Sequence, residues 1–211
     1  MSNSTGSSGQ LFIIAAPSGG GKTSLVRELL KNDPRLVLSV SHTTREPRPG
    51  EEQSGQYHFV ALAAFKEMVD QGEFMEHATV FGNMYGTNRQ TVARQLEQNH
   101  DVILEIDWQG ARQVRKDFPD CCSIFILPPS LETLETRLTE RGQDSAEVIQ
   151  RRMNEARDEI AHWSEFTHLI VNNNFQTAVE DLASIINDHR NGQQRVANKD
   201  YQILAQSLGT S

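Results

Sequence analysis

A short apolar run followed at once by a glycine-rich turn is the feature that most constrains this chain. The run is LFIIA at residues 11–15, and the turn is APSGGGKT at residues 16–23. A strand that leads into such a turn, with Gly-Lys-Thr at its end, is typical of a loop that binds a nucleoside triphosphate. Glycines let backbone N–H groups converge on phosphate oxygens, and the following helix contributes its positive N-terminal end. The predicted triphosphate-binding residues are Ala16, Pro17, Ser18, Gly19, Gly20, Gly21, Lys22 and Thr23.

Two residues of this turn are expected to carry its chemistry. Lys22 is predicted to reach the β- and γ-phosphates, and Thr23 to offer its hydroxyl to Mg²⁺. The first position departs from the motif, because Ala16 stands where glycine is usual and alanine is disfavoured at positive φ. A glycine-rich turn without function is the alternative, but such a turn does not require Lys-Thr at this spacing.

Length and charge exclude several classes of protein. A chain of 211 residues is expected to form one elaborated domain or two small ones, at about 150 residues per domain. The formal net charge of -8 argues against a nucleic-acid polymer as partner. No apolar run approaches the roughly 20 residues of a spanning helix, and residues 1–9 do not resemble a signal peptide. The adjacent Cys121 and Cys122 suggest buried thiols in a reducing compartment, so we expect a cytoplasmic protein.

Apolar runs and helical patterns alternate along the chain, which predicts the α/β class with a parallel sheet flanked by helices. In such sheets, ligands bind beyond the carboxyl ends of the strands, where the glycine-rich turn lies. The expected strands are 11–15, 36–40, 102–106, 123–127 and 169–171. The expected helices are 23–31, 88–98, 110–116, 131–141, 145–163 and 177–188.

Two segments interrupt this alternation. Residues 41–87 are rich in glycine and proline, with short β-like pieces at 57–60 and 74–81, and are interpreted as a small inserted β-rich lobe. An arginine-rich helical segment at about 137–157 is the second. The predicted division is a tail at 1–9, a core at 10–40 and 88–190, and a polar C-terminal extension at 191–211. That extension has a weak apolar stripe, which fits either a terminal helix or a contact in a homo-oligomer.

A proline-stiffened loop at residues 42–50, HTTREPRPG, places Arg45 and Arg48 three positions apart. Guanidinium groups bind phosphate through paired hydrogen bonds, so two of them can converge on one anion. Taken alone, the segment fits a solvated basic loop equally well. In a chain that also has a triphosphate loop, a second phosphate site is the better hypothesis.

Acidic residues occur in or after two apolar segments. Glu76 lies in the run FMEHA at 74–78 and faces either solvent, the commoner case, or a pocket. Glu105 and Asp107 end an apolar strand, as does the acid that organises Mg²⁺ in triphosphate-binding proteins. Because side chains alternate along a strand, both are expected on one face, with at least one reaching the site.

Four arginines lie in the second interrupting segment, namely Arg137, Arg141, Arg151 and Arg152. Arg137 and Arg141 share one helix face at this spacing. A surface face paired with nearby glutamates is the common interpretation. In a phosphoryl-transfer enzyme, mobile arginines instead close over the γ-phosphate and stabilise developing charge.

From about Gln10 to Ile186, the chain resembles the guanylate kinases, in particular the bacterial ones. The motifs that carry the resemblance, in the family's order and spacing, are the glycine-rich turn, SHTTREPRPG (41–50), GNMYGT (82–87), IDWQG (106–110) and LPPS (127–130). The resemblance implies a P-loop core with an inserted monophosphate-binding lobe and a lid, which match the two interrupting segments. It further implies Mg²⁺-assisted transfer of the γ-phosphate of ATP to GMP or dGMP.

The resemblance also implies roles for matching residues. Those that would bind the GMP phosphate and its surroundings are Ser41, Arg45, Arg48, Tyr57, Tyr85 and Gly86. Those that would read guanine are Glu76, Thr87 and Asp107. Those that would act on the transferring phosphoryl are Lys22, Arg45, Arg137, Arg141 and Arg152. The chain departs from the family in two places: aspartate is frequent where Glu105 stands, and Val-Asn-Asp-Asp is frequent where residues 171–174 read VNNN.

Two other functions fit parts of the pattern. Guanylate-kinase-like domains of scaffolding proteins bind peptides without catalysis, but they usually have a degraded phosphate loop. A kinase of another nucleoside monophosphate is the second alternative, and the guanine-reading set argues against it.

Overall fold

The computed structural model describes residues 9–47, 51, 55–140 and 145–209, so the predicted site residues Arg48 and Arg141 lie outside the described residues. The chain forms two compact units. The first comprises Met1–Leu11, Arg35–Leu104 and Gln109–Cys121, and the second comprises Phe12–Pro34, Glu105–Trp108 and Cys122–Ser211. Both units are therefore assembled from segments that lie far apart in the sequence. The predicted lobe and lid boundaries follow a different division and remain predictions.

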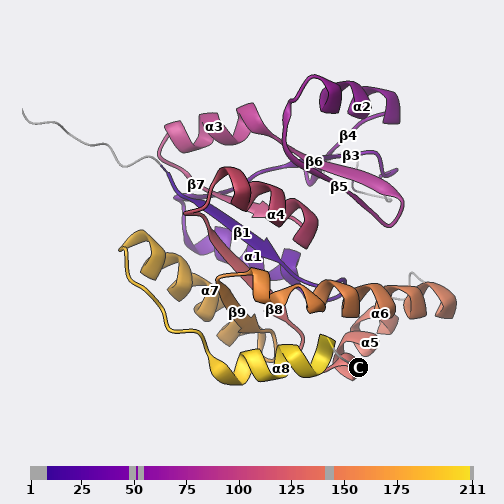
Figure 1. The fold of residues 1–211 in the computed structure, drawn as a ribbon, viewed down its shortest axis with the longest axis vertical. Coiled ribbons are helices and arrows are strands. Elements are labelled where there is room, and N and C mark those ends of the chain that lie inside the picture. The colour runs from indigo at the N-terminus through magenta and orange to yellow at the C-terminus, as the bar shows by residue number, and fades with distance from the viewer. Residues whose placement is uncertain (1–8, 48–50, 52–54, 141–144, 210–211) are drawn as a thin grey trace, which may run out of the picture. The chain divides into compact units, whose positions relative to one another are not determined.

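Five strands form one sheet in the order β2 (Leu36–Leu38), β7 (Asp101–Glu105), β1 (Leu11–Ala15), β8 (Cys122–Leu127) and β9 (His168–Val171). Figure 1 labels the last four of them. The pairs β2–β7, β1–β8 and β8–β9 are parallel, with Ile14 opposite Ile124 and Ile126 opposite Ile170. Every residue of β1 and β8 is buried, as expected for strands covered on both faces. The predicted α/β class with a parallel sheet is confirmed.

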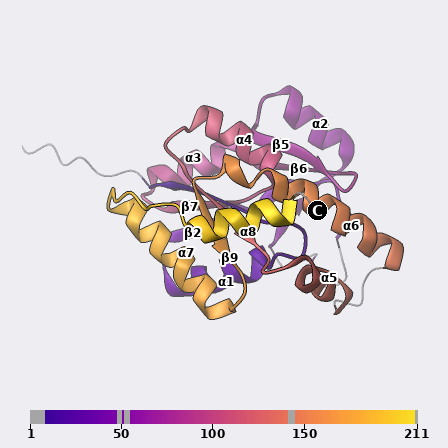
Figure 2. The ribbon, with the colours of Figure 1, turned by 60° about the horizontal axis from the view of Figure 1, so that its bottom comes forward.

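Helices fill the connections between the strands. They are α1 (Lys22–Asn32), α2 (Leu62–Asp70), α3 (Arg89–Glu97), α4 (Trp108–Asp117), α5 (Leu131–Glu140), α6 (Ala146–Ala161), α7 (Phe175–Arg190) and α8 (Lys199–Gly209), with a short 3-10 helix at Trp163–Glu165. Within the second unit, α1 packs against α7, and α6 packs against both α5 and α8 (Figure 2). The six predicted helices are all present, with ends that differ by at most two residues.

A second sheet lies in the first unit, with the strand order β4 (Tyr57–Phe59), β3 (Ser41–Thr43), β6 (Asn83–Asn88) and β5 (Phe74–Val80). Strands β5 and β6 pair antiparallel, as do β3 and β6. These strands confirm the two predicted β-like pieces. The β-rich interpretation of this segment did not include α2, which lies between β4 and β5. Leu62, Phe65 and Val69 of α2 recur at helical spacing, so the sequence does carry a helix signal here, although only Phe65 is buried.

The polar C-terminal extension contains α8. This helix packs against α6 and β9 and buries Ala205 and Leu208, which confirms the terminal-helix interpretation of the weak apolar stripe. Ile203, another apolar residue of α8, remains 66% exposed. Among the residues that the structure describes, no helix has the length and apolar character needed to cross a membrane.

Candidate functional site

The loop between β1 and α1 has the backbone shape of an anion site. Gly19 and Gly21 have φ values of 85° and 88°, a left-handed conformation that residues with a Cβ rarely adopt. Gly21 directly precedes α1, and no side chain of the described residues caps that helix. The N–H groups of its first turn are therefore left for a ligand, and phosphate suits their positive end.

Ala16 fits this loop without strain. Within the described part of the chain, Phe81 and Asn99 are the only residues other than glycine with positive φ. The glycine that is usual at position 16 is therefore not needed here for its backbone freedom.

Asn172 connects the loop to one of the predicted arginines. Its Nδ2 donates a hydrogen bond to the backbone oxygen of Gly20 at 2.9 Å, and Arg137 Nη2 donates to the backbone oxygen of Asn172 at 2.9 Å. A Cβ on Gly21 would come within 2.4 Å of the same Nδ2 atom, so this position excludes a side chain. A cavity of about 460 Å³ opens here, lined by Gly19, Gly21, Ser24, Arg137, Glu140, Asn172, Asn173 and Phe175.

The two functional side chains of the loop contact the end of β7. Thr23 Oγ1 donates a short hydrogen bond to Glu105 Oε1, and Lys22 Nζ donates to the backbone oxygen of Ile106 at 3.2 Å. Glu105 is therefore the acid that meets the phosphate loop. The expected shared strand face with Asp107 was wrong, because β7 ends at Glu105 and Asp107 lies beyond it.

Sequence reasoning missed Glu159, which also touches the phosphate loop. It lies near the end of α6, and its Oε2 atom accepts a hydrogen bond from the backbone N–H of Ser18 at 2.9 Å. The segment AEVIQRRMNEARDEIA contains four acidic residues without any distinguishing pattern, so no sequence signal separates Glu159 from the others. The contact joins residues 141 positions apart and depends on the tertiary fold.

Burial raises the pKa of Glu159 from its ordinary value of 4.5 to about 7. Asp107 and Glu155 add to this rise through repulsion of the carboxylate. The Ser18 N–H and the Lys22 ammonium oppose it, because both stabilise the ionised form. At neutral pH, Glu159 is thus an acid close to half protonation beside a phosphate-binding loop.

This group gives the folded protein a pH-dependent stability. Between pH 4.5 and about 7, the folded state binds more protons at Glu159 than the unfolded state does, so stability falls as pH rises through this range. We expect Glu159→Gln to remove this contribution, so its melting temperature should rise relative to wild type between about pH 5 and about pH 8. Thermal unfolding of both proteins across this range measures the difference. If the difference in melting temperature between Glu159→Gln and wild type does not change with pH, the raised pKa of Glu159 is contradicted. The same holds if Glu155→Gln on the same helix shows an equal change with pH.

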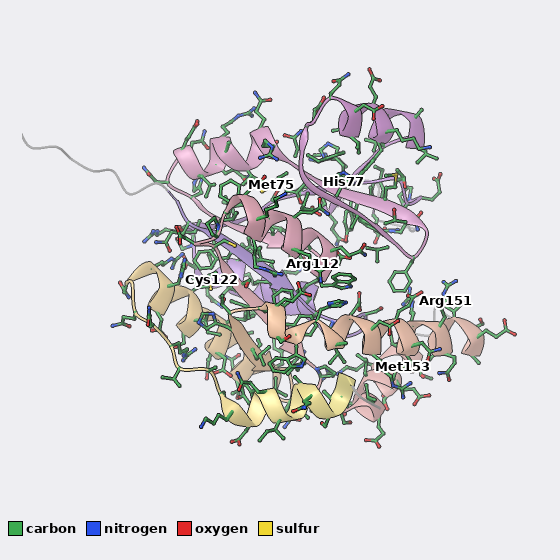
Figure 3. All side chains as sticks on the ribbon, in the orientation of Figure 1. Met75, His77, Arg112, Cys122, Arg151 and Met153 are labelled. Atoms are coloured by element: carbon green, nitrogen blue, oxygen red, sulfur yellow. The ribbon has the colours of Figure 1, made fainter. Side chains whose placement is uncertain are left out.

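Helices α5 and α6 pack together through an apolar cluster. Leu134, Leu138, Met153 and Ala156 are buried in it. In Figure 3, Met153 and Arg151 are labelled on α6; Met153 is 5% exposed, whereas 62% of the Arg151 side chain is exposed. Arg152 is half-buried on the same helix. The helical interpretation of the arginine-rich segment is confirmed for its described residues, which belong to α5, to α6 and to the N-cap of α6.

Glu76 is buried in the first unit, with 3% exposure, so the solvent-facing interpretation was wrong. Thr87 Oγ1 on the paired strand donates a hydrogen bond to Glu76 Oε1 at 2.5 Å. A shift of register lies between Phe74 and Glu76, and Met75 and Glu76 are both buried. Met75 and His77, which flank Glu76 on β5, are labelled in Figure 3.

A glycine of α4 leaves room for this carboxylate. A Cβ on Gly110 would lie 2.4 Å from Glu76 Oε2, so a larger residue would displace the Glu76 side chain. Glu76 is therefore held between a hydroxyl on one side and a helix backbone on the other. An ionised carboxylate only accepts hydrogen bonds, so a ligand that pairs with Glu76 would present N–H or O–H donors.

Arg45, in the first unit, is held by an acidic side chain and two aromatic rings. Its Nη2 atom pairs with Glu51 Oε2 at 2.8 Å, and its guanidinium lies 5.6 Å from the ring centroids of both Tyr57 and Phe59. Tyr57 and Tyr85 have ring centroids 5.9 Å apart. The structure thus brings three of the predicted acceptor-site residues together.

Three further residues predicted to bind GMP lie on different elements of the chain. Ser41 pairs with Tyr57 in the β3–β4 register. Gly86 is buried on β6, where a Cβ would come within 2.9 Å of the Phe74 ring, so its small size serves close packing. Asp107 belongs to the second unit, whereas Glu76 and Thr87 belong to the first.

The fold and the loop together define a P-loop nucleotide-binding protein. Its signature is a strand of a parallel sheet, followed by a glycine-rich turn and a helix that begins with Lys22 and Thr23. Comparison with known proteins narrows this class. The family model described as guanylate kinase matches residues 8–189.

Individual relatives agree with the family model. A guanylate kinase of Alkalilimnicola ehrlichii is 56% identical over 200 residues, covering 95% of this chain and 97% of the relative. A guanylate kinase of Methylobacillus flagellatus is 54% identical over 200 residues, covering 95% of this chain and 98% of the relative. The crystal structure of guanylate kinase from Anaplasma phagocytophilum matches with a TM-score of 0.73 and 32% identity, covering 90% of this chain and 89% of that one. The chain belongs to the guanylate kinase family.

Proposed function

We propose that this chain transfers the γ-phosphoryl group of ATP to GMP, and to dGMP, giving ADP and GDP or dGDP. The observation that carries the proposal is the intact phosphate loop, with Lys22 and Thr23 at the start of α1, in a member of the guanylate kinase family. The reaction needs in-line positioning and neutralisation of charge, and no covalent enzyme intermediate. The enzyme is an ATP-dependent nucleoside monophosphate kinase.

The donor site is the phosphate loop at residues 16–23. Backbone N–H groups of the loop and of the first turn of α1 bind the phosphates, and Lys22 turns from Ile106 to the β- and γ-phosphates. Arg137, Arg141 and Arg152 stabilise the charge that spreads over the transferring phosphoryl. The contact of Arg137 with Asn172, next to the loop, supports this role. Closure of the lid at about 137–157 would exclude water from the reaction.

Mg²⁺ is the proposed cofactor, and the residues at the end of β7 fit it. Thr23 and Glu105 present oxygen donors side by side, which is the ligand type that Mg²⁺ prefers. Among the described residues, no group of three or more His, Cys, Asp or Glu side chains is placed to hold a metal, so substrate phosphates and waters would complete the coordination. When bound, Mg²⁺ neutralises phosphate charge. Thr23 would bind it directly, and Glu105, or Asp107 through water, would orient its shell.

Most residues of the proposed acceptor site belong to the first unit, whereas Asp107 belongs to the second. Arg45 and Arg48 hold the GMP phosphate, together with Ser41, Tyr57 and Tyr85. The arrangement of Arg45 among Tyr57, Tyr85 and Glu51 supports this, because the guanidinium is already oriented by its neighbours. Glu76, Thr87 and Asp107 read the base.

Replacing Arg45 by alanine is expected to raise the Michaelis constant for GMP far more than that for ATP. Losing a charge-assisted hydrogen bond costs about 1.5–3 kcal/mol, which is roughly 10- to 150-fold in affinity. Initial rates with each nucleotide varied in turn measure the effect, with Arg94→Ala on exposed α3 as the control. If the effect is confined to ATP, Arg45 belongs to the donor site instead.

A coupled assay of ADP release with GMP, dGMP, AMP, UMP and CMP tests the proposed function. ADP release is expected with GMP and dGMP and only weakly with the other acceptors. Equal rates with AMP or a pyrimidine nucleotide would identify another monophosphate kinase. No release with any acceptor would favour a non-catalytic binding module.

A cytoplasmic location completes the proposal. Cys121 and Cys122 are both buried thiols outside any disulfide, as is usual in a reducing compartment.

A further inference from the structure

Glu159 is a partly buried acid at the phosphate loop, and the reaction as described above has no use for it. Its Oε2 atom accepts the hydrogen bond of the Ser18 N–H at 2.9 Å. Ser18 lies in the turn before Gly19 and Gly21, whose positive φ values bend the backbone. A backbone N–H that loses its partner in such a partly buried turn is destabilising, so removal of Glu159 should let the turn change its shape.

The same helix carries one of the proposed phosphoryl-binding arginines. Arg152 precedes Glu159 by seven residues on α6, which is two helical turns, so both side chains start from one face of the helix. Glu159 lies just beyond the proposed end of the lid at residue 157. It is therefore placed to tie the base of the lid helix to the loop that binds the phosphates of ATP.

The charges around Glu159 suit this position. Lys22 on α1 attracts the carboxylate, whereas Asp107 after β7 and Glu155 on α6 repel it. Burial favours the protonated form. A carboxyl group that accepts a proton readily can remain beside the phosphates of ATP with less repulsion than a fixed negative charge.

We propose that Glu159 is a positioning residue of the ATP site, which fixes the shape of the phosphate loop through the Ser18 N–H and couples this loop to α6. The role rests on the proposed function of that loop. What matters is a hydrogen-bond acceptor at this place, rather than the negative charge. Glutamine keeps an acceptor oxygen at the same distance from the backbone, and alanine removes it.

The test compares Glu159→Ala, Glu159→Gln and the control Glu155→Ala, which lies one turn earlier on α6 with its side chain 38% exposed. Glu159→Ala is expected to raise the Michaelis constant for ATP about tenfold or more and to leave that for GMP within about twofold. Glu159→Gln is expected to recover most of the ATP affinity, and Glu155→Ala to resemble wild type. Thermal unfolding shows whether each variant is folded.

Calorimetric titration with a non-hydrolysable ATP analogue separates this inference from the proposed function. If wild type makes no GDP but binds the analogue more tightly than Glu159→Ala does, the proposed function fails and the positioning role stands. Unchanged ATP parameters in a folded Glu159→Ala variant would overturn the role. An equal rise of the Michaelis constants for ATP and GMP in Glu159→Ala would also overturn the role. So would a Glu159→Gln variant whose ATP affinity is as low as that of Glu159→Ala. If Glu159→Ala does not fold, the comparison of Glu159→Gln with wild type decides, and a tenfold loss of ATP affinity there would overturn the role.

Discussion

Replacing Lys22 by alanine is expected to lower kcat/KM by about 10²-fold or more, roughly 3 kcal/mol of transition-state stabilisation, while the fold survives. The ammonium group stands at the N-terminus of α1, where it donates a hydrogen bond to the backbone oxygen of Ile106 and attracts the Glu159 carboxylate. Neither interaction belongs to the apolar core, so we expect the fold to survive their loss. The loss should therefore appear in catalysis, where the group would meet the charge of the transferring phosphoryl.

Lys31→Ala is the matched control for this prediction. Lys31 lies in the last turn of the same helix, with its side chain 63% exposed and paired with Glu28. Steady-state rates of both variants, together with circular dichroism and thermal unfolding, separate catalysis from stability. Activity of Lys22→Ala within a few-fold of wild type, with a native spectrum, would disprove the phosphate-loop assignment.

Replacing Glu76 by glutamine is expected to weaken the choice of guanine over adenine. Guanine presents its N1–H and its N2 amino group as donors, and a carboxylate can accept from both. Adenine presents a bare N1 acceptor and has no N2 amino group. Sites built on such polar pairing can discriminate by about 10⁴, because the wrong base leaves buried groups unpaired.

The surroundings of Glu76 make this substitution informative. The carboxylate is buried and already accepts a hydrogen bond from Thr87, so it is oriented before any ligand arrives. Glutamine keeps the size of the side chain but turns one acceptor into a donor, which faces the guanine donors unfavourably. We expect a large drop in kcat/KM for GMP and a much smaller drop, or none, for the residual reaction with AMP.

Glu67→Gln on α2, an exposed position of the same unit, serves as the control for base selectivity. The ratio of kcat/KM for GMP to that for AMP is the measured quantity. If Glu76→Gln keeps the wild-type ratio, Glu76 does not read the base, and Thr87 and Asp107 would have to select guanine without it.

Local sequence signals were sufficient where one element carries the whole pattern. The run at residues 11–15 and the glycines that follow predicted β1, the phosphate loop and α1, because the buried strand, the positive φ values and the helix start are all encoded within a few residues. The mostly apolar β8 was equally predictable. Helix α2 was missed although Leu62, Phe65 and Val69 recur at helical spacing, because the glycines and prolines around it favoured a β-rich interpretation of the whole segment.

Contacts between distant segments could not be read in this way. Glu76 shares a buried face of β5 with Phe74 and Ala78, but alternation along a strand does not tell which face other segments cover. The Ser18–Glu159 contact and the link from Arg137 through Asn172 to Gly20 arise from packing of helices and loops around the sheet. The motif resemblance supplied the roles of residues that composition and spacing left open, but it offered none for Glu159.

Chromatographic separation of the nucleotides formed from ATP and GMP tests the central claim most directly. Transfer of the γ-phosphoryl group predicts that ADP and GDP appear in equal amounts, and that neither forms at a comparable rate when GMP is left out. ADP without GDP would show hydrolysis of ATP instead of transfer, and an absence of both products from the folded protein with Mg²⁺ present would contradict the assignment as a guanylate kinase.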